Sequence, residues 1–221
     1  MKENSETLYI ENKNVIKVNK LIKFNALGLE KYKIKNLGWF PNPNLGVIDV
    51  ETYLNNKNVN EIYALGFRTN LAPEPVIYYI DSNYDSDNLV LQMIDELLRP
   101  KYSNITFYCH NLGGYDVIYI LKILTRYNDN NNNDTKYIIL PILRDDKIIK
   151  LTIKKDNNTL NILDSYCMLI KSLSGLAKDF GVETQKSLFP YKFSTTGNLF
   201  YKGNTPAKHF YNDLSQKDYN K

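Results

Sequence analysis

The chain has 221 residues, 43% of them apolar, which is enough for one domain of moderate size plus an extension. Its net charge of +4 and pI near 8.8 fit a nucleic-acid partner, but they fit many soluble enzymes equally well. No apolar run approaches the roughly 20 residues of a membrane span, and the first residues lack the apolar core of a secretory signal. We therefore expect a soluble protein.

Residues 1 to about 40 are polar and carry only short apolar clusters, so we interpret residues 1–42 as an N-terminal extension whose role the sequence does not give. From Leu45 onward, short runs rich in β-branched and aromatic residues alternate with polar loops, which is the pattern of successive strands. Three of these runs, at 45–53, 61–69 and 75–80, predict an antiparallel meander.

The segments after the meander alternate between helix and strand. Apolar side chains at helical spacing predict a helix within 86–100, behind a Ser/Asp cap. The remaining expected elements are a strand at 104–111, a helix at 116–127, an Asn-rich surface loop at 128–135, a hairpin of 137–144 with 147–155, a strand at 159–165 and a helix at 173–180. The order βββαβαβββα is how ribonuclease H-like nucleases begin, so we expect an α/β fold with a mixed sheet flanked by helices.

Asp49 and Glu51 are the first candidates for chemistry. They follow the apolar run 45–48, so both carboxylates should project from the same face of a strand. Two carboxylates placed in this way can share a hard cation such as Mg²⁺ with a substrate phosphate. An Asp-x-Glu pair also occurs often without such a role.

The second candidate is the string HNLGGYD, which runs from His110 to Asp116 between a predicted strand and a predicted helix. A carboxylate at this junction lies at an edge where ligands can approach, and the Gly pair lets the backbone come close to a substrate. The alternative is a plain turn, in which Tyr115 belongs to the core and Asp116 caps the helix.

The cysteines and histidines give no sign of a structural metal. Cys109 and Cys167 lie far apart, and neither they nor the two histidines show CxxC or HxxxH spacing. The sequence therefore predicts no zinc site and no disulfide framework.

Together, the two candidate strings resemble the Exo I (DxE) and Exo II (Nx2-3(F/Y)D) motifs of family B DNA polymerase proofreading domains. Residues 186–189, KSLF, resemble the Lys-x-x-hydrophobic motif of the protein-primed branch. Residues 164–169, DSYCML, resemble that branch's (S/T)Lx2h motif, with Tyr166 in place of the usual Leu. Over roughly residues 45–221 the chain is therefore similar to the exonuclease region of a protein-primed family B polymerase.

The resemblance implies a ribonuclease H-like DEDD exonuclease that uses two Mg²⁺ or Mn²⁺ ions to hydrolyse the terminal phosphodiester of a single-stranded 3′ end. Asp49 would bridge both ions, Glu51 would bind the ion nearer the attacking water, and Asp116 would support the second ion. Lys186 would stabilise charge developing on the phosphate or the leaving group.

The resemblance also implies residues that hold the frayed strand end rather than cut it. A Tyr at position 166 can still stack on a base, a contact worth about 1–3 kcal/mol. Each of these residues has an ordinary alternative as a core aromatic, a cap or a turn residue. The implied DNA-binding residues are Thr52, His110, Asn111, Tyr115, Tyr119, Ser165 and Tyr166.

The family's Exo III motif, Y-x3-D, has no counterpart, because no Tyr of the 221 residues has an Asp four positions later. We therefore expect residues 43–221 to form a C-terminally incomplete exonuclease domain, with Exo III and the polymerase domain beyond Lys221, and with poor activity alone. His209 and Asp213 imitate the H-x4-D of a sister exonuclease class, but one residue is missing, which on a helix turns the carboxylate by about 100°.

The expected function is replication of a linear plasmid or organellar element by a DNA-directed DNA polymerase with 3′–5′ exonuclease activity. Abundant Lys, Asn, Ile and Tyr suggest AT-rich codons, and the resemblance is strongest to polymerases of linear plasmids in fungal mitochondria, so a mitochondrial location is expected. A terminal protein primer would be a partner of the full-length enzyme. Two alternatives remain: a non-catalytic single-strand-binding remnant, and a stand-alone exonuclease that uses His209 and Asp213.

Overall fold

The computed structural model describes residues 7–11, 14–18, 44–72, 74–131, 135–182, 189–212 and 214–219. Contacts between residues divide the chain into two units, Met1–Phe40 and Pro41–Lys221. In the first unit, strands β1 (Thr7–Glu11) and β2 (Asn14–Val18) pair as an antiparallel hairpin. The sequence did not predict this hairpin, because two strands of five residues are too short for their alternation to stand out.

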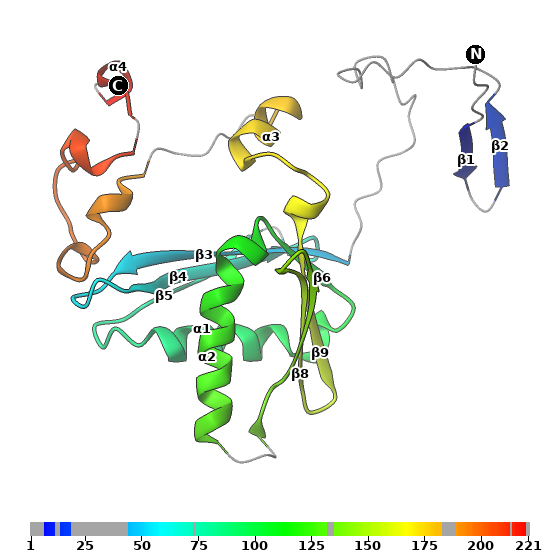
Figure 1. The fold of residues 1–221 in the computed structure, drawn as a ribbon, viewed down its shortest axis with the longest axis horizontal. Helices are drawn as coiled ribbons and strands as arrows, with labels where there is room; N and C mark the ends of the chain where they lie inside the picture. Colours follow the sequence, from blue (N-terminus) through cyan, green and yellow to red (C-terminus); the bar gives the residue numbers. More distant parts are fainter. Residues whose placement is uncertain are drawn as a thin grey trace. The chain divides into compact units, whose positions relative to one another are not determined.

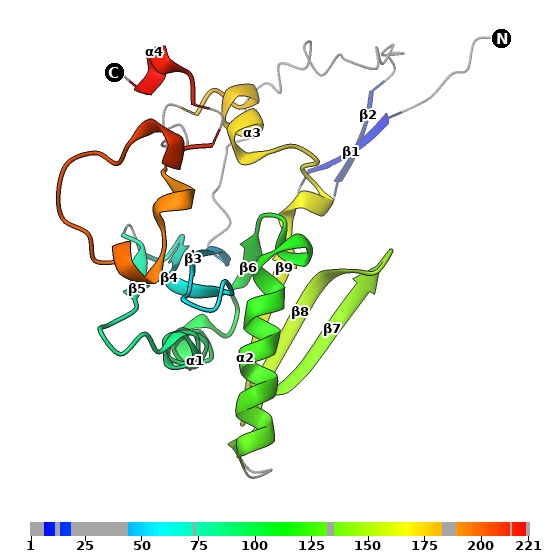
Figure 2. The same ribbon diagram turned by 60° about the vertical axis from the view of Figure 1, so that its left-hand side comes forward.

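The second unit contains a seven-stranded mixed sheet with the order β5-β4-β3-β6-β9-β8-β7 (Figures 1 and 2). The central strands β3, β6 and β9 are parallel, and the other neighbouring pairs are antiparallel. The strands are β3 (Leu45–Leu54), β4 (Asn60–Thr69), β5 (Val76–Tyr79), β6 (Thr106–Cys109), β7 (Ile138–Arg144), β8 (Lys147–Lys155) and β9 (Asn158–Asp164).

The predicted fold class is confirmed by this strand order. The first three strands of the sheet form the expected meander, and β6 and β9 then enter beside β3 in parallel. In the order β5-β4-β3-β6-β9, β4 alone runs opposite to the other four strands, and this is the ribonuclease H-like arrangement. The β7–β8 hairpin extends the sheet beyond β9.

The helices are α1 (Ser86–Leu97), α2 (Asp116–Asn130), α3 (Leu173–Asp179) and α4 (Gln216–Tyr219). Helix α1 begins where predicted, because the Asp85 side chain accepts a hydrogen bond from the backbone N–H of Asn88. In the described part of the chain, none of these helices has the length and apolar content that a membrane crossing requires.

The prediction of a surface loop from residue 128 was wrong at its start, since α2 continues to Asn130. The physical reason is a tertiary contact. The Asn128 side chain accepts a hydrogen bond from the backbone N–H of Tyr137 at 2.9 Å and donates one to the Tyr137 carbonyl at 2.8 Å. These two bonds hold the last turn of α2 against the start of β7.

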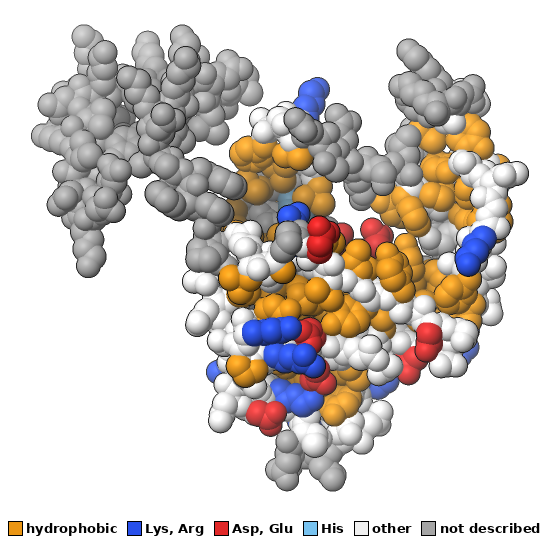
Figure 3. Space-filling model, turned by 180° about the vertical axis from the view of Figure 1, so that it is seen from behind, with side chains coloured by type: hydrophobic (Ala, Val, Ile, Leu, Met, Phe, Trp, Pro, Cys, Tyr) orange, Lys and Arg blue, Asp and Glu red, His pale blue; other side chains and the backbone are white. Residues whose placement is uncertain are grey.

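The core of the second unit lies between α1, α2 and one face of the sheet (Figures 1 and 2). Alternate residues of β3, β6 and β9 point into it, and Phe107 of β6 is fully buried among them. Seen from behind, the molecule exposes hydrophobic side chains over its middle, beside basic and acidic ones (Figure 3). The exposed apolar residues of β3 and β5 include Val47, Ile77 and Tyr79.

After β9 the chain returns to the end of β3. The backbone N–H of Leu54 donates to the Ser194 carbonyl at 2.9 Å, and the rings of Tyr84 and Phe200 meet edge to face at 5.6 Å. The short 3-10 helices are η1 (Pro100–Tyr102), η2 (Leu112–Gly114), η4 (Ser165–Cys167), η5 (Tyr191–Phe193), η6 (Thr196–Asn198) and η7 (Lys208–Phe210).

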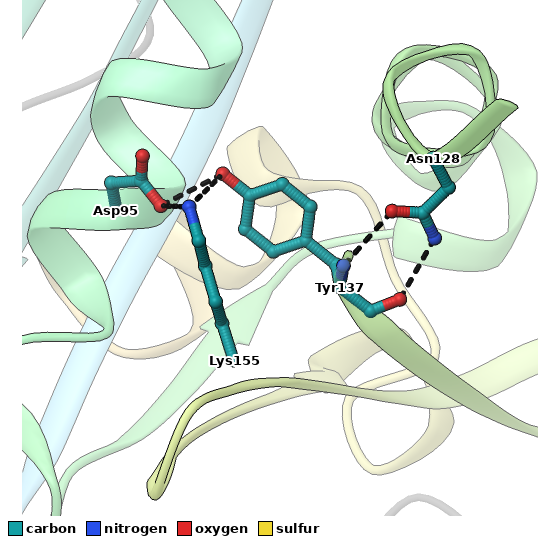
Figure 4. A network of polar contacts seen from close by, with 4 residues as sticks. All are labelled: Asp95, Asn128, Tyr137 and Lys155. Atoms are coloured by element: carbon teal, nitrogen blue, oxygen red, sulfur yellow. Dashed lines mark hydrogen bonds and ion pairs between the residues drawn. The ribbon is translucent and has the colours of Figure 1, made fainter. Parts of the chain in front are cut away.

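A polar network at the far end of α2 joins both long helices to the hairpin (Figure 4). The Tyr137 hydroxyl donates to Asp95 Oδ1 of α1 at 2.7 Å, and Lys155 Nζ of β8 lies 3.0 Å from the same oxygen. Lys155 Nζ also lies 3.2 Å from the Tyr137 hydroxyl and 4.5 Å from the centre of its ring. Together with Asn128, these residues fix the position of the β7–β8 hairpin relative to α1 and α2.

Tyr137→Phe is expected to destabilise the protein by about 1–2 kcal/mol, because it removes a buried hydroxyl that two charged groups share. Tyr79→Phe, on an exposed ring of β5, is the matched control and should change stability by less than about 0.5 kcal/mol. Urea denaturation of the variants gives both values. Equal stabilities for Tyr137→Phe and the wild type would contradict the role given to the network.

Candidate active site

The candidate residues gather at the carboxyl ends of the three parallel strands. Asp49 and Glu51 lie in β3, His110 directly follows β6, and Asp164 ends β9. Ligands of open α/β sheets bind outside the carboxyl ends of parallel strands, where the direction of the chain connections changes. The fold therefore brings the two sequence motifs to one edge of the sheet.

A cavity of about 660 Å³ opens at this edge. It is lined by eight of the eleven predicted site residues, which come from both motifs and from the segment after β9. The lining also contains three polar residues that no sequence motif indicated: Ser172, Ser174 and Tyr191. The eight predicted residues are Asp49, Glu51, Thr52, His110, Asn111, Tyr115, Asp116 and Tyr166.

Two of the remaining predicted residues, Ser165 and Tyr119, are not among the residues that line this cavity. Ser165 is hydrogen-bonded to His110, which does line the cavity. The Tyr119 ring packs edge to face against Tyr115, with 5.2 Å between the ring centres. Lys186 lies outside the described residues. Of the alternative pair, His209 packs against Phe210 in η7, and Asp213 also lies outside the described residues.

Asp116 and Cys109 form a buried pair beside Asp49. Asp116 is the first residue of α2 and is 4% exposed, and the Cys109 thiol donates a hydrogen bond to its Oδ2 at 3.2 Å. One ligand atom from each of Asp49, Cys109 and Asp116 lies within 4.8 Å of the others. Carboxylates from the Exo I-like and Exo II-like strings therefore meet, as a shared cation site requires.

The position of Asp116 changes its acidity. Burial, and then the nearby charge of Asp49, raise the pKa of the Asp116 carboxyl to about 6, although the Cys109 hydrogen bond opposes the shift. Burial also raises the pKa of the Cys109 thiol far above its usual range, and the Asp116 charge adds to this effect. Cys109 is therefore a neutral thiol that donates to the carboxylate.

The residues of the cavity suit a divalent cation. Asp49, Glu51 and Asp116 bring three carboxylates to its wall, while no Lys or Arg appears among the described residues of the lining. Hard cations such as Mg²⁺ and Mn²⁺ prefer carboxylate oxygens, and a cation between Asp49 and Asp116 would offset the cost of burying the Asp116 charge. This donor set therefore fits the metals that the sequence resemblance implies.

One wall of the cavity joins the two motifs directly. The Thr52 hydroxyl at the end of β3 is hydrogen-bonded to the Tyr115 hydroxyl that precedes α2. A bulge lies at this point of the β3–β4 pairing, between Glu51 and Thr52. On the opposite side of β3, burial and then the Glu51 charge raise the pKa of Tyr63 to about 12. The Glu51 carboxylate thus lies near the Tyr63 side chain of β4.

His110 ties the opposite wall together. Its Nε2 lies 2.8 Å from the Lys171 carbonyl, so this nitrogen must carry the proton, and its Nδ1 lies 3.0 Å from the Ser165 hydroxyl. The ring also meets Tyr166 edge to face at 5.5 Å. Both ring nitrogens are thus engaged within the protein, and the segment 165–171 is held beside the end of β6.

Gly113 is required by a close approach between the loop and the hairpin. A Cβ at this position would lie 2.5 Å from the backbone oxygen of Ile148 in β8. Gly113→Ala is therefore expected to destabilise the protein by about 1–3 kcal/mol and to displace the start of α2. Gly197→Ala in η6 is the matched control, since nothing lies within 4 Å of its added Cβ. The midpoints of thermal unfolding of the two variants are compared. Equal midpoints for Gly113→Ala and Gly197→Ala would contradict the close approach of Gly113 to Ile148.

Several known proteins are similar to this chain in sequence. The family model described as "DNA polymerase type B, organellar and viral" matches residues 98–221. A "Probable DNA polymerase" of Podospora anserina is 32% identical over 253 residues, covering 92% of this chain and 21% of that protein. Another, of Ascobolus immersus, is 29% identical and covers 96% of this chain and 17% of that protein. The chain thus spans about a fifth of the length of these relatives.

Among solved structures, phi29 DNA polymerase complexed with single-stranded DNA aligns with 66% of this chain and 25% of that chain. The aligned residues are 19% identical, and the TM-score is 0.48. The strand order, rather than this partial similarity, establishes the fold.

Proposed function

Because the chain belongs to the organellar and viral type B DNA polymerases, we propose that Pro41–Lys221 holds the 3′–5′ exonuclease site of such a polymerase. The observation that carries the proposal is the cavity of about 660 Å³ at the ends of β3, β6 and β9. It collects the carboxylates of both motifs, together with hydroxyl, amide and aromatic groups suited to a strand end. The residues proposed to cut the strand and those proposed to hold it thus line the same cavity.

In the proposed site, Asp49, Glu51 and Asp116 hold divalent cations. Mg²⁺ or Mn²⁺ bound there supplies activation of a water molecule and neutralises charge on the leaving oxygen. Asp116 is fixed for this task by the start of α2 and by the Cys109 thiol, while Asp49 and Glu51 are fixed by the β3 backbone. Lys186, by its place in the Lys-x-x-hydrophobic motif, would stabilise the charge that develops on the phosphate.

The remaining lining groups would hold the last nucleotides of a frayed strand. Tyr166, 38% exposed, offers a ring for base stacking, and the Asn111 amide and the Thr52–Tyr115 hydroxyl pair offer polar contacts to sugar and phosphate. Tyr191 adds a second half-exposed ring on the same cavity. In this arrangement His110 acts by holding the wall that carries Tyr166.

The whole enzyme would be a protein-primed DNA polymerase that replicates a linear plasmid or an organellar element, with a mitochondrial location. The fungal relatives named as probable DNA polymerases support this proposal, and so does the abundance of Lys, Asn, Ile and Tyr, which suggests AT-rich codons. DNA synthesis and the use of a terminal protein primer would belong to that whole enzyme. This chain spans about a fifth of the length of the relatives.

The proposal is tested with single-stranded oligonucleotides labelled at the 5′ end. With Mn²⁺ we expect a ladder of products shortened from the 3′ end, slow because the Y-x3-D carboxylate is not part of the 221 residues. The activity should co-elute with the protein on size exclusion, and EDTA should abolish it. A strand blocked by a 3′-terminal phosphorothioate is the matched substrate control.

A non-catalytic single-strand-binding remnant is the second candidate, favoured by the exposed aromatic residues of the cavity wall. It predicts that the labelled strand binds but is not shortened at any Mn²⁺ concentration. That result would overturn the exonuclease proposal and support the remnant.

A further inference from the structure

Asp164 joins the loop between β6 and α2 to the segment that follows β9, although none of the sequence motifs assigns it a role. It is the last residue of β9 and is 7% exposed. Its Oδ1 accepts hydrogen bonds from the backbone N–H groups of Asn111 at 3.0 Å and Tyr166 at 2.8 Å. Its Oδ2 accepts one from the backbone N–H of Gly113 at 3.1 Å.

Only one of these three bonds is local. The bond to Tyr166 caps the short helix η4, as an Asp at this place commonly does. The bonds to Asn111 and Gly113 span 53 and 51 residues of sequence and reach the loop between β6 and α2. A carboxylate needed only as a cap would not have to bind that loop.

The two bound segments contribute different groups to the cavity. The loop containing Asn111 and Gly113 leads directly into Asp116, whose carboxylate belongs to the candidate cation site. The segment after β9 carries Tyr166, which offers its ring to a base. The distance between the cleaving and the binding sides of the cavity therefore depends on a link between these segments.

We propose that Asp164 is a positioning residue that sets the place of Tyr166 and Asn111 relative to Asp116, so that a strand end held on one side presents its terminal phosphodiester to the other. The inference rests on the proposed exonuclease function and deepens it. Asn111 adopts a left-handed conformation, with φ at 64°, and its N–H bonds the Asp164 carboxylate, so Asp164 binds the loop at the residue where its backbone turns.

Asp164→Asn is the informative variant, because it keeps the size of the side chain. An amide has one accepting oxygen, so its NH₂ group must face at least one of the three N–H donors and that bond is lost. The hydrogen bonds of His110 to Ser165 and Lys171 do not involve Asp164, so a second attachment between the segments remains. Asp164→Ala, which loses all three bonds, extends the series.

The matched control is Asp85→Asn. Asp85 also caps a helix through a backbone N–H, at the start of α1, and it does not line the cavity. Any effect that comes only from replacing a capping carboxylate by an amide should appear in this variant as well, since the amide oxygen can still accept the single bond from Asn88.

The experiment compares hydrolysis of two substrates in Mn²⁺: a single-stranded oligonucleotide, and thymidine 5′-(4-nitrophenyl phosphate), which is too short to reach both sides of the cavity. For Asp164→Asn we expect the ratio of kcat/KM values, strand over ester, to fall about tenfold, with a larger fall for Asp164→Ala. Asp85→Asn should leave the ratio unchanged. A variant that is only less well folded would lose activity on both substrates to the same extent, so the ratio of its kcat/KM values would stay unchanged.

Binding of the same oligonucleotide, labelled with a fluorophore and measured in Ca²⁺, is the second readout. We expect about tenfold weaker binding by Asp164→Asn and unchanged binding by Asp85→Asn. An unaltered ratio together with unaltered binding in Asp164→Asn would overturn the inference. If the wild type hydrolyses neither substrate but Asp164→Asn still loses binding, the exonuclease proposal fails while the positioning role stands.

Discussion

Asp116→Asn is expected to make the metal-free protein more stable and, at the same time, to remove its nuclease activity. In the folded chain, burial raises the pKa of Asp116 from an ordinary 3.8 to about 6. A difference of this size is worth about 3 kcal/mol against folding once the group is ionised in the folded state. An uncharged amide at this place avoids that cost.

The pH dependence gives this prediction its sign. Below about pH 4 the carboxyl is protonated in both the folded and unfolded states and costs nothing. As the pH rises to about 6, the unfolded chain loses the proton first, and the wild type loses stability relative to the variant. In EDTA, urea denaturation should therefore find Asp116→Asn equal to the wild type near pH 4 and up to about 3 kcal/mol more stable at pH 7.5.

Mn²⁺ completes this test. It should stabilise the wild type at pH 7.5 by binding only the folded state, and it should stabilise Asp116→Asn much less. Strand cleavage by the variant should fall by about a hundredfold or more, since a carboxylate of the cation site is lost. A variant that is less stable than the wild type at pH 7.5 in EDTA would contradict the electrostatic account of Asp116.

Asp49→Asn is expected to remove activity without an equal gain in stability. Asp49 is exposed, and it contributes less than burial does to the raised pKa of Asp116, so neutralising it relieves only part of that cost. Its carboxylate would nevertheless hold the cations that the reaction needs, so we expect cleavage to fall by about a thousandfold. Activity assays in Mn²⁺ and urea denaturation in EDTA, run beside Asp116→Asn, measure both effects.

The two Asn variants separate charge from burial, because the same chemical change is made at an exposed and at a buried position of one site. Retained cleavage in Asp49→Asn would contradict its place in the cation site. A gain in stability as large as that of Asp116→Asn would show that repulsion between the carboxylates, rather than burial, dominates the cost.

Much of the fold could be predicted because its elements carry strong local patterns. The meander of β3, β4 and β5 and the helices α1 and α2 stand out by alternation or by helical spacing. The end of α2 could not be predicted, because Asn has a low helix propensity. The bonds between Asn128 and Tyr137 that stabilise its last turn are tertiary contacts, which no local pattern shows. The hairpin of β1 and β2 was missed because its runs are short.

The candidate site divides in the same way. Asp49, Glu51 and Asp116 could be found because they stand in strings with recognisable spacing. Asp164 and Tyr191 could not, because their part in the site depends on which backbone groups and cavity they face after the strands have paired. The place of His110 was predicted as part of its motif, but its two internal hydrogen bonds depend on residues 55 and 61 positions away.

The buried Cys109 thiol also makes the protein suitable for selective chemical labelling. Cys109 is 2% exposed and is held as a neutral donor to Asp116, so it should be slow to react with maleimides or iodoacetamide. Cys167, half-buried in η4, is the other cysteine of the chain and directly follows Tyr166. A fluorophore attached there without any engineered cysteine would report on the arrival of a strand end at the cavity.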